Sequence, residues 1–242
     1  MSKGLTGKGF GFMGLLFEPF ILFIILFLPG AFGRTVPSAE IPLEMGEEIA
    51  EQIEILPPPV VFSSFQELNR ILVYNLPALA LIWYLLLRPE INKKGQIPGF
   101  CRRDLYSVLV ALPALLFTAL SIFLAASLLK EIPGGARPAS PPARISAWIL
   151  IFLSCLSTGY LEESFFRYYL HKKLSRFGLD APRFILVSTA LFSLCHLYEG
   201  PWGVMNACFA GLLLGLIFVR FRALHGIALA HGLYNLLVYI TA

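Results

Sequence analysis

The chain has 242 residues, of which 57% are hydrophobic and only 14% are charged, and its mean hydropathy is +0.74. Soluble domains carry roughly one quarter charged residues, so this composition excludes an ordinary soluble protein and predicts a multi-span membrane protein in contact with the lipid bilayer. The formal net charge of +4 is small and is spread over the loops, which argues against a nucleic-acid partner.

Runs of about twenty apolar residues predict about seven transmembrane helices. The fifth run is short for a full crossing, and the Glu199-Gly200-Pro201 turn that follows favours a tight or partly immersed connection to the sixth. The fold class is therefore an all-α, polytopic membrane helix bundle. The predicted spans lie near residues 10–32, 70–88, 105–129, 147–170, 184–199, 202–220 and 224–241.

The first apolar run has two interpretations. Lys3 and Lys8 precede it and the small residues Gly30 and Ala31 end it, so a cleaved signal peptide is the alternative to a membrane span. The length of the run favours the span. Glu18 stands inside this run, and the sequence assigns its carboxylate no role.

Basic residues gather on one side of the predicted bundle. Because cytoplasmic loops carry an excess of Lys and Arg, the loops after the second and fourth spans should be cytoplasmic. Six glutamates between residues 40 and 54 place the segment after the first span on the opposite side. We interpret that segment as a solvated acidic loop, with a gate or substrate-docking element as the alternative. The basic residues of the two loops are Arg88, Lys93, Lys94, Arg102, Arg103, Lys172, Lys173, Arg176 and Arg183.

Three charged residues stand at the end of the fourth apolar run: Glu162, Glu163 and Arg167. An ionisable group at bilayer depth costs about 2.5–3.5 kcal/mol on insertion scales, and it usually marks a pathway or a reacting site. Glu163 and Arg167 are four residues apart, so they lie on one helix face and can neutralise each other. Glu162 is rotated by about 100°, which leaves its carboxylate free to act as a general base. A cluster of snorkelling interfacial side chains is the alternative.

Two further polar pairs fall inside apolar runs. Phe192 and His196 lie one turn apart in the fifth run, and His231 and Asn235 lie one turn apart in the seventh. Imidazole and carboxamide groups can both donate hydrogen bonds to a reacting atom. They can equally serve as hydrogen-bonded packing residues between membrane helices.

Together these three signals resemble the CPBP intramembrane proteases, a family that includes the type II CAAX prenyl endopeptidases and the bacterial Abi-type membrane proteins. The family's Glu-Glu-x-x-x-Arg motif is met at residues 162–167, its Phe-x-x-x-His motif at 192–196 and its His-x-x-x-Asn motif at 231–235. The resemblance covers about the last hundred residues. We therefore divide the chain into an N-terminal transmembrane region, 1–146, and a catalytic transmembrane core, 147–242.

The resemblance implies a glutamate-type intramembrane endopeptidase with its active site inside the last four helices. Glu162 and His196 would activate a water as general base, and His231 and Asn235 would donate hydrogen bonds to the developing oxyanion. The substrate would be a membrane-associated protein or peptide, whose identity the sequence does not disclose. A short chain without appended domains favours a multi-pass protein of a bacterial plasma membrane.

In the same scheme, Glu163 and Arg167 would position the helix end. Two histidines and two glutamates are also a donor set for zinc. No His-Glu-x-x-His pair occurs, and the two histidines come from separate predicted helices, so we expect no metal or other cofactor and rank zinc second. The 4 cysteines lack metal-ligand spacing and three of them lie inside apolar runs, so we interpret them as buried thiols.

Two other classes of function remain open at the level of sequence. A non-catalytic membrane immunity or scaffold protein would use the same polar side chains for helix packing. A proton-coupled transporter would use the glutamates and histidines as a relay, although no internal repeat supports duplicated halves. The full set of acid, base and donor groups favours the hydrolase.

Overall fold

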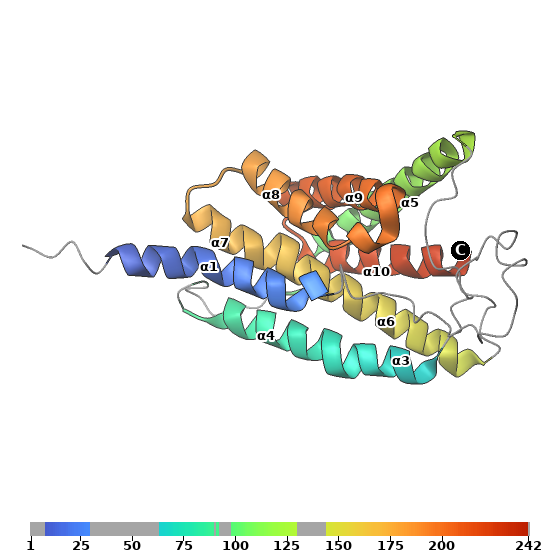
Figure 1. The fold of residues 1–242 in the computed structure, drawn as a ribbon, viewed down its shortest axis with the longest axis horizontal. Helices are drawn as coiled ribbons and strands as arrows, with labels where there is room; N and C mark the ends of the chain where they lie inside the picture. The colour runs from blue at the N-terminus through green and yellow to red at the C-terminus, as the bar shows by residue number, and fades with distance from the viewer. Residues whose placement is uncertain (1–7, 30–62, 90, 92–97, 130–143, 242) are drawn as a thin grey trace, which may run out of the picture.

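The computed structural model describes residues 8–29, 63–89, 91, 98–129 and 144–241 (Figure 1). The acidic 40–54 segment and most of the two loops that flank the predicted third span fall outside these residues. Within the described ranges every regular element is helical, which confirms the predicted all-α bundle.

A short first helix and a long composite helix form the N-terminal part of the bundle. Helix α1 covers Lys8–Leu26, and the composite helix consists of α3 (Ser64–Asn69), the π-helical segment η1 (Arg70–Asn75) and α4 (Leu76–Leu87). Helix α5 (Arg102–Leu128) follows. Ser63 caps α3 by accepting a hydrogen bond from the Gln66 amide, as expected of an N-cap serine.

A second composite helix forms the spine of the molecule. It consists of α6 (Ile145–Glu163), the π-helical segment η2 (Ser164–Tyr169) and α7 (Leu170–Arg176). The chain then turns back into α8 (Ala181–Leu194) and passes through the short 3-10 helix η3 (Leu197–Glu199). It ends in α9 (Gly200–Phe221) and α10 (Leu224–Thr241).

The other helices pack around this spine. In Figure 1, α3 and α4 run along one side of it and α10 along another, and α8 lies against α9. Helix α5 packs on both α9 and α10. Helix α1 reaches the spine at the aromatic pair that follows the two glutamates: the Phe27 ring centroid lies 4.9 Å from those of both Phe165 and Phe166.

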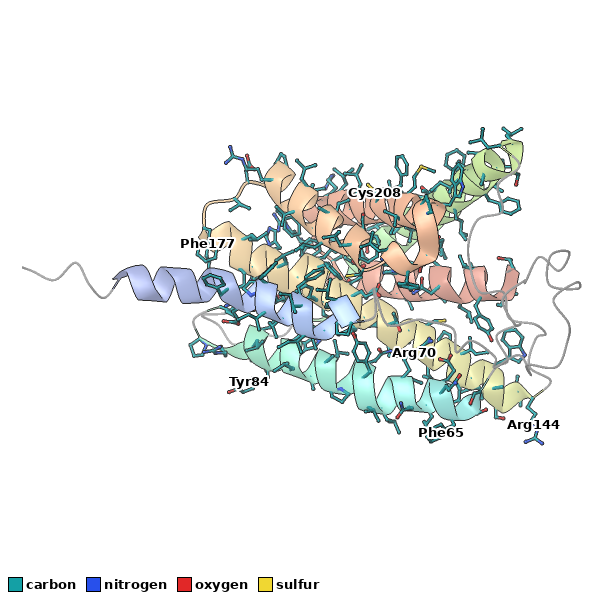
Figure 2. All side chains as sticks on the ribbon, in the orientation of Figure 1. Phe65, Arg70, Tyr84, Arg144, Phe177 and Cys208 are labelled. Atoms are coloured by element: carbon teal, nitrogen blue, oxygen red, sulfur yellow. The ribbon has the colours of Figure 1, made fainter. Side chains whose placement is uncertain are left out.

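Among the described residues, five helical stretches are long and apolar enough to cross a membrane. Ala181–Leu194 is a shorter apolar helix and corresponds to the predicted short fifth span. In α1 (Lys8–Leu26), the apolar stretch whose side chains are described is Phe17–Leu26. Large apolar side chains cover the outside of the bundle, among them Phe65 at 78% and Tyr84 at 67% exposure (Figure 2). In a membrane this surface is available to lipid. The five long stretches are Ser64–Leu87, Arg102–Leu128, Ile145–Arg176, Leu197–Phe221 and Leu224–Thr241.

Candidate active site

The two adjacent glutamates end α6 and differ in burial. The Glu163 side chain has no exposed surface, whereas 16% of the Glu162 side chain remains exposed. The π-helical segment η2 begins at the next residue, Ser164. Such π-helical turns are rare and occur frequently at functional sites. One carboxylate is thus held inside the bundle, and its neighbour keeps access to a further partner.

Arg167 neutralises the buried glutamate. Its guanidinium is fully buried, and its Nη1 lies 3.2 Å from Oε1 of Glu163. Nη2 donates a hydrogen bond of 3.2 Å to the carbonyl of Gly211 on α9. The guanidinium also lies over the ring of Phe192, 4.6 Å from its centroid, where the negative face of the ring attracts a cation. Arg167 therefore ties α6, α8 and α9 together around Glu163.

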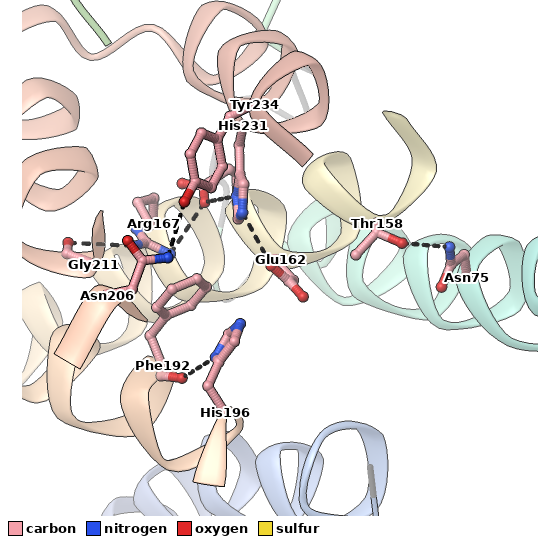
Figure 3. A network of polar contacts seen from close by, with 11 residues as sticks. Asn75, Thr158, Glu162, Arg167, Phe192, His196, Asn206, Gly211, His231 and Tyr234 are labelled. Carbon is pink, nitrogen blue, oxygen red and sulfur yellow. Dashed lines mark hydrogen bonds and ion pairs between the residues drawn. The ribbon is translucent and has the colours of Figure 1, made fainter. Parts of the chain in front are cut away.

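His231 of α10 contacts both glutamates (Figure 3). Its Nδ1 lies 2.8 Å from Oε1 of Glu163, and its Nε2 lies 3.6 Å from Oε2 of Glu162. With the ring proton assigned to Nδ1, that nitrogen donates to the Glu163 carboxylate. The second distance is longer than a hydrogen bond. Glu163 thus fixes the orientation of the imidazole, and its Nε2 faces Glu162.

A close approach of α6 and α10 makes this contact between helices feasible. A Cβ atom on Gly159 would lie 2.7 Å from the backbone nitrogen of Gly232, and one on Gly232 would lie 2.9 Å from the Cα of Leu156. No ordinary side chain fits at either distance, so two glycines meet here. Gly159 is one turn before Glu163, and Gly232 follows His231 directly. The glycine contact sets the distance between the two functional side chains.

Phe192 lies between the two histidines of the predicted site. Its ring centroid is 4.7 Å from that of His196 and 5.8 Å from that of His231. His196 follows the end of α8, and its Nδ1 lies at hydrogen-bond distance, 2.8 Å, from the Phe192 carbonyl. Figure 3 shows the His196 ring directed to the side of Phe192 on which the Glu162 carboxylate lies. The Phe-x-x-x-His spacing thus serves to lock the imidazole against its own helix end.

Asn235, the sixth predicted residue, does not join this contact network. It lies one turn beyond His231 on α10 and is half-buried. Its side chain makes no hydrogen bond with any residue that the structure describes. The structure therefore brings together Glu162, Glu163, Arg167 and His231 by direct contact and His196 through Phe192, and it leaves the Asn235 carboxamide available.

A different asparagine, which the sequence analysis missed, is part of the network. Asn206 of α9 donates a 2.9 Å hydrogen bond from Nδ2 to the hydroxyl of Tyr234, next to Asn235 in the chain. The Oδ1 atom of Asn206 is buried and has no hydrogen-bond partner among the described residues. The available signal was a carboxamide inside the sixth apolar run, since a buried polar group of this kind needs a hydrogen-bond partner.

Glu18, left without a role by the sequence, forms a separate ionic cluster. Its Oε1 accepts a 2.7 Å hydrogen bond from the Tyr169 hydroxyl, and its Oε2 lies 2.8 Å from Nζ of Lys173 and 3.9 Å from Nη1 of Arg88. Lys173 is 1% exposed. The cluster joins α1 to the spine and to the end of α4, away from the two glutamates of α6.

The glutamates and histidines of the site are the candidate ligands for a metal ion. In the described ranges, no group of three or more His, Cys, Asp or Glu side chains is arranged to hold a metal ion. Oε1 of Glu163 already contacts both Arg167 and His231. The His231 nitrogen Nε2 faces Glu162, whose carboxylate is partly exposed.

A comparison with known families places these residues in a wider context. The sequence model of the type II CAAX prenyl endopeptidase Rce1-like family matches residues 144–237. The matched region begins just before α6 and ends within α10, so it contains the spine, the two histidines and Asn235. No curated protein and no solved structure matches the chain. Helices α1, α3, α4 and α5 and the segment η1 lie outside the matched region.

Proposed function

We propose, from the match of residues 144–237 to the type II CAAX prenyl endopeptidase Rce1-like family, that the protein is an intramembrane endopeptidase of the glutamate type. It hydrolyses a peptide bond in a membrane-associated protein or peptide. We place it as a multi-pass protein in a cell membrane, with the bacterial plasma membrane as the first choice. The lipid bilayer supplies both its surroundings and the route by which a membrane-bound substrate arrives.

The arrangement of Glu162 next to His231 is the observation that supports this function most strongly. A partly exposed carboxylate lies 3.6 Å from an imidazole nitrogen, at a depth where unpaired charges are costly. The neighbouring Glu163 and Arg167 are fully buried and neutralise each other. Glu163 and Arg167 thus form a structural ion pair, and the Glu162 carboxylate remains available as the general base that activates water in hydrolysis.

In the proposed reaction, Glu162 assisted by His196 takes a proton from a water molecule as the water oxygen attacks the scissile carbonyl carbon. His231, protonated on both ring nitrogens, donates from Nε2, and Asn235 donates from its carboxamide, to the carbonyl oxygen as it becomes negative, which stabilises the transition state. The carbon–nitrogen bond then breaks, and the proton held by Glu162 passes to the leaving amine. The products are a new carboxylate and a new amino terminus.

Terminal-peptide mass spectrometry of membranes tests this proposal. Cells carrying the wild type, Glu162→Gln or His196→Ala at matched expression are compared. The controls are Asp180→Asn, an acid-to-amide change at an exposed helix N-cap where both residues cap well, and His171→Ala outside the site. We expect a membrane protein whose new terminus vanishes in the two site variants and persists in both controls. Unchanged termini in all five samples would contradict hydrolysis and favour a binding or immunity role.

The same assay separates a metal-free site from a zinc site. Treatment of purified protein with a strong zinc chelator should leave cleavage of the identified substrate unchanged, because Glu163 is already engaged by Arg167 and His231. Loss of cleavage on chelation, with recovery when zinc is added back, would reverse this part of the proposal.

A further inference from the structure

A line of polar side chains runs along α6 from Glu162 towards the beginning of the helix at Ile145. Thr158 lies one turn before Glu162, Ser157 is next to it, and Ser154 lies about one turn further along. At 3.6 residues per turn these positions share one face of the helix. That face packs against α3 and η1, which lie outside the region matched by the family.

Asn75, the last residue of η1, makes the closest contacts with this line. It is 1% exposed, and its Nδ2 donates to the hydroxyls of Ser157 at 2.8 Å and Thr158 at 3.0 Å; Figure 3 shows the second contact. The Ser157 hydroxyl in turn donates to the Ser154 carbonyl at 3.0 Å. Arg70, the first residue of η1, donates to the Ser154 hydroxyl at 3.4 Å. A hydrogen-bonded seam therefore joins η1 to α6.

An ion pair stands at the outer end of this seam. Nη1 of Arg70 lies 3.3 Å from Oε2 of Glu67 on α3. That oxygen is buried, and within the described ranges it has no hydrogen-bond partner. Cys155 on α6 follows Ser154 directly and is partly buried. Charged groups thus mark one end of the seam, and Glu162 marks the other.

The seam contains more polar and charged side chains than are needed to hold the helices together. Hydrogen bonds between membrane helices commonly hold them together, and the contacts of Asn75 alone would serve that purpose. The buried oxygen of Glu67 has an ion-pair partner in Arg70 but no hydrogen bond from the described residues, and a hydrogen bond to such an atom lowers the cost of its burial. Water satisfies such groups in protein interiors. Ser157 and Thr158 are half-buried, so the neighbouring helices do not seal this face of α6 completely.

We propose that the polar seam formed by Glu67, Arg70, Asn75, Ser154, Ser157 and Thr158 is hydrated and connects Glu162 to the aqueous phase on the membrane side opposite the basic loop between α7 and α8. The seam then carries water to the carboxylate from that side of the membrane. This goes beyond the proposed function, because it is a statement about access that holds whether or not the protein cleaves a peptide.

The native cysteines provide a test in the wild-type protein. Two preparations of sealed vesicles, one right-side-out and one inside-out, are treated separately with a charged, membrane-impermeant methanethiosulfonate. This reagent reacts with the thiolate that forms in water. Cys155 borders the seam. Cys208 lies on the outside of α9 (Figure 2), and Cys101 precedes Arg102 and Arg103 at the start of α5. Both of these cysteines are exposed, so the prediction of buried thiols is wrong for them. We expect Cys155 to be labelled about tenfold faster from the side opposite the basic loops, and Cys101 from the basic side. Cys208 should stay unlabelled from either side.

Introduced cysteines extend the test towards Glu162. Ser157→Cys and Thr158→Cys lie in the seam, and the control Leu153→Cys lies at similar depth on the exposed, lipid-facing side of α6. The seam positions should react from the side opposite the basic loops, and the control should not. The proposal is wrong if Cys155 and the seam positions react equally fast or faster from the basic side, or if they do not react. Cys155 is native, so this outcome does not depend on the folding of any variant.

Discussion

The hydrogen bond between His231 and Glu163 crosses from α10 to α6 at 2.8 Å and joins two residues that are 68 positions apart in the chain. Oε1 of Glu163 also lies 3.2 Å from Arg167. One buried oxygen therefore holds both the imidazole that faces Glu162 and the cation that neutralises the site.

Removal of one partner of the buried ion pair should destabilise the protein strongly. In Glu163→Gln, the Arg167 guanidinium stays fully buried without a counter-charge, which typically costs about 3–5 kcal/mol. Unfolding of the purified protein in a denaturing detergent series measures the change. The double variant Glu163→Leu with Arg167→Met should recover part of the lost stability, because no charge then remains buried. A double variant less stable than Glu163→Gln would contradict this explanation.

Adding one methyl group at the contact between α6 and α10 should lower the activity. In Gly232→Ala the new Cβ would lie 2.9 Å from the Cα of Leu156, so the helices must separate. A displacement of about 1 Å can cost about 100-fold in rate, and we expect kcat to fall by that order. Gly99→Ala is the control, because a Cβ there meets nothing within 4 Å. Equal rates for both variants would show that the helix distance does not matter.

The two asparagines should separate catalysis from stability. Asn235 makes no side-chain hydrogen bond with the described residues, so Asn235→Ala should leave the free energy of unfolding unchanged and lower kcat about 100- to 1,000-fold, as loss of an oxyanion donor does. Asn206→Ala removes the 2.9 Å bond to Tyr234 and should cost about 1 kcal/mol of stability. Kinetics and unfolding of both variants are compared. A stability loss in Asn235→Ala with unchanged kcat would reverse the assignment.

The Glu18 cluster should act on stability alone. Glu18→Gln weakens the hydrogen bonds that Lys173 and Tyr169 make with the carboxylate, and we expect a loss of about 1.5–3 kcal/mol for a bond to a charged group. The value stays below that for a fully buried pair because 25% of the Glu18 side chain is exposed. Adding Lys173→Met should restore stability. Cleavage per folded molecule should match the wild type, and a loss of kcat at full stability would place Glu18 in the reaction.

Much of the architecture was predictable because lipid imposes long apolar runs. The composition and the runs predicted the all-α bundle, and the shortness of the fifth run anticipated α8. The clustering of Glu162, Glu163 and Arg167 was also readable, since residues one turn apart share a helix face. The spacing of residues within one helix therefore predicts which side chains lie close together.

Contacts between distant segments were not readable in the same way. The Tyr169–Glu18 bond joins residues 151 positions apart, and nothing in the local sequence of either residue indicates the other. The π-helical turns of η1 and η2 likewise depend on tertiary packing, because intrinsic propensities favour an uninterrupted α-helix. For the same reason the sequence did not distinguish Asn206, which is held by Tyr234, from Asn235, which is free of such a bond to the described residues.

The distance along the chain between Glu18 and Lys173 has a consequence for biogenesis. The carboxylate of α1 leaves the ribosome 155 residues before the ammonium that neutralises it. An unpaired charge is costly in hydrocarbon, and Arg88 at the end of α4, 3.9 Å from the same carboxylate, is synthesised before Lys173. We therefore expect α1 to dock in two stages. It first pairs with the end of α4, and it gains its closest ionic contact only after α7 has been made.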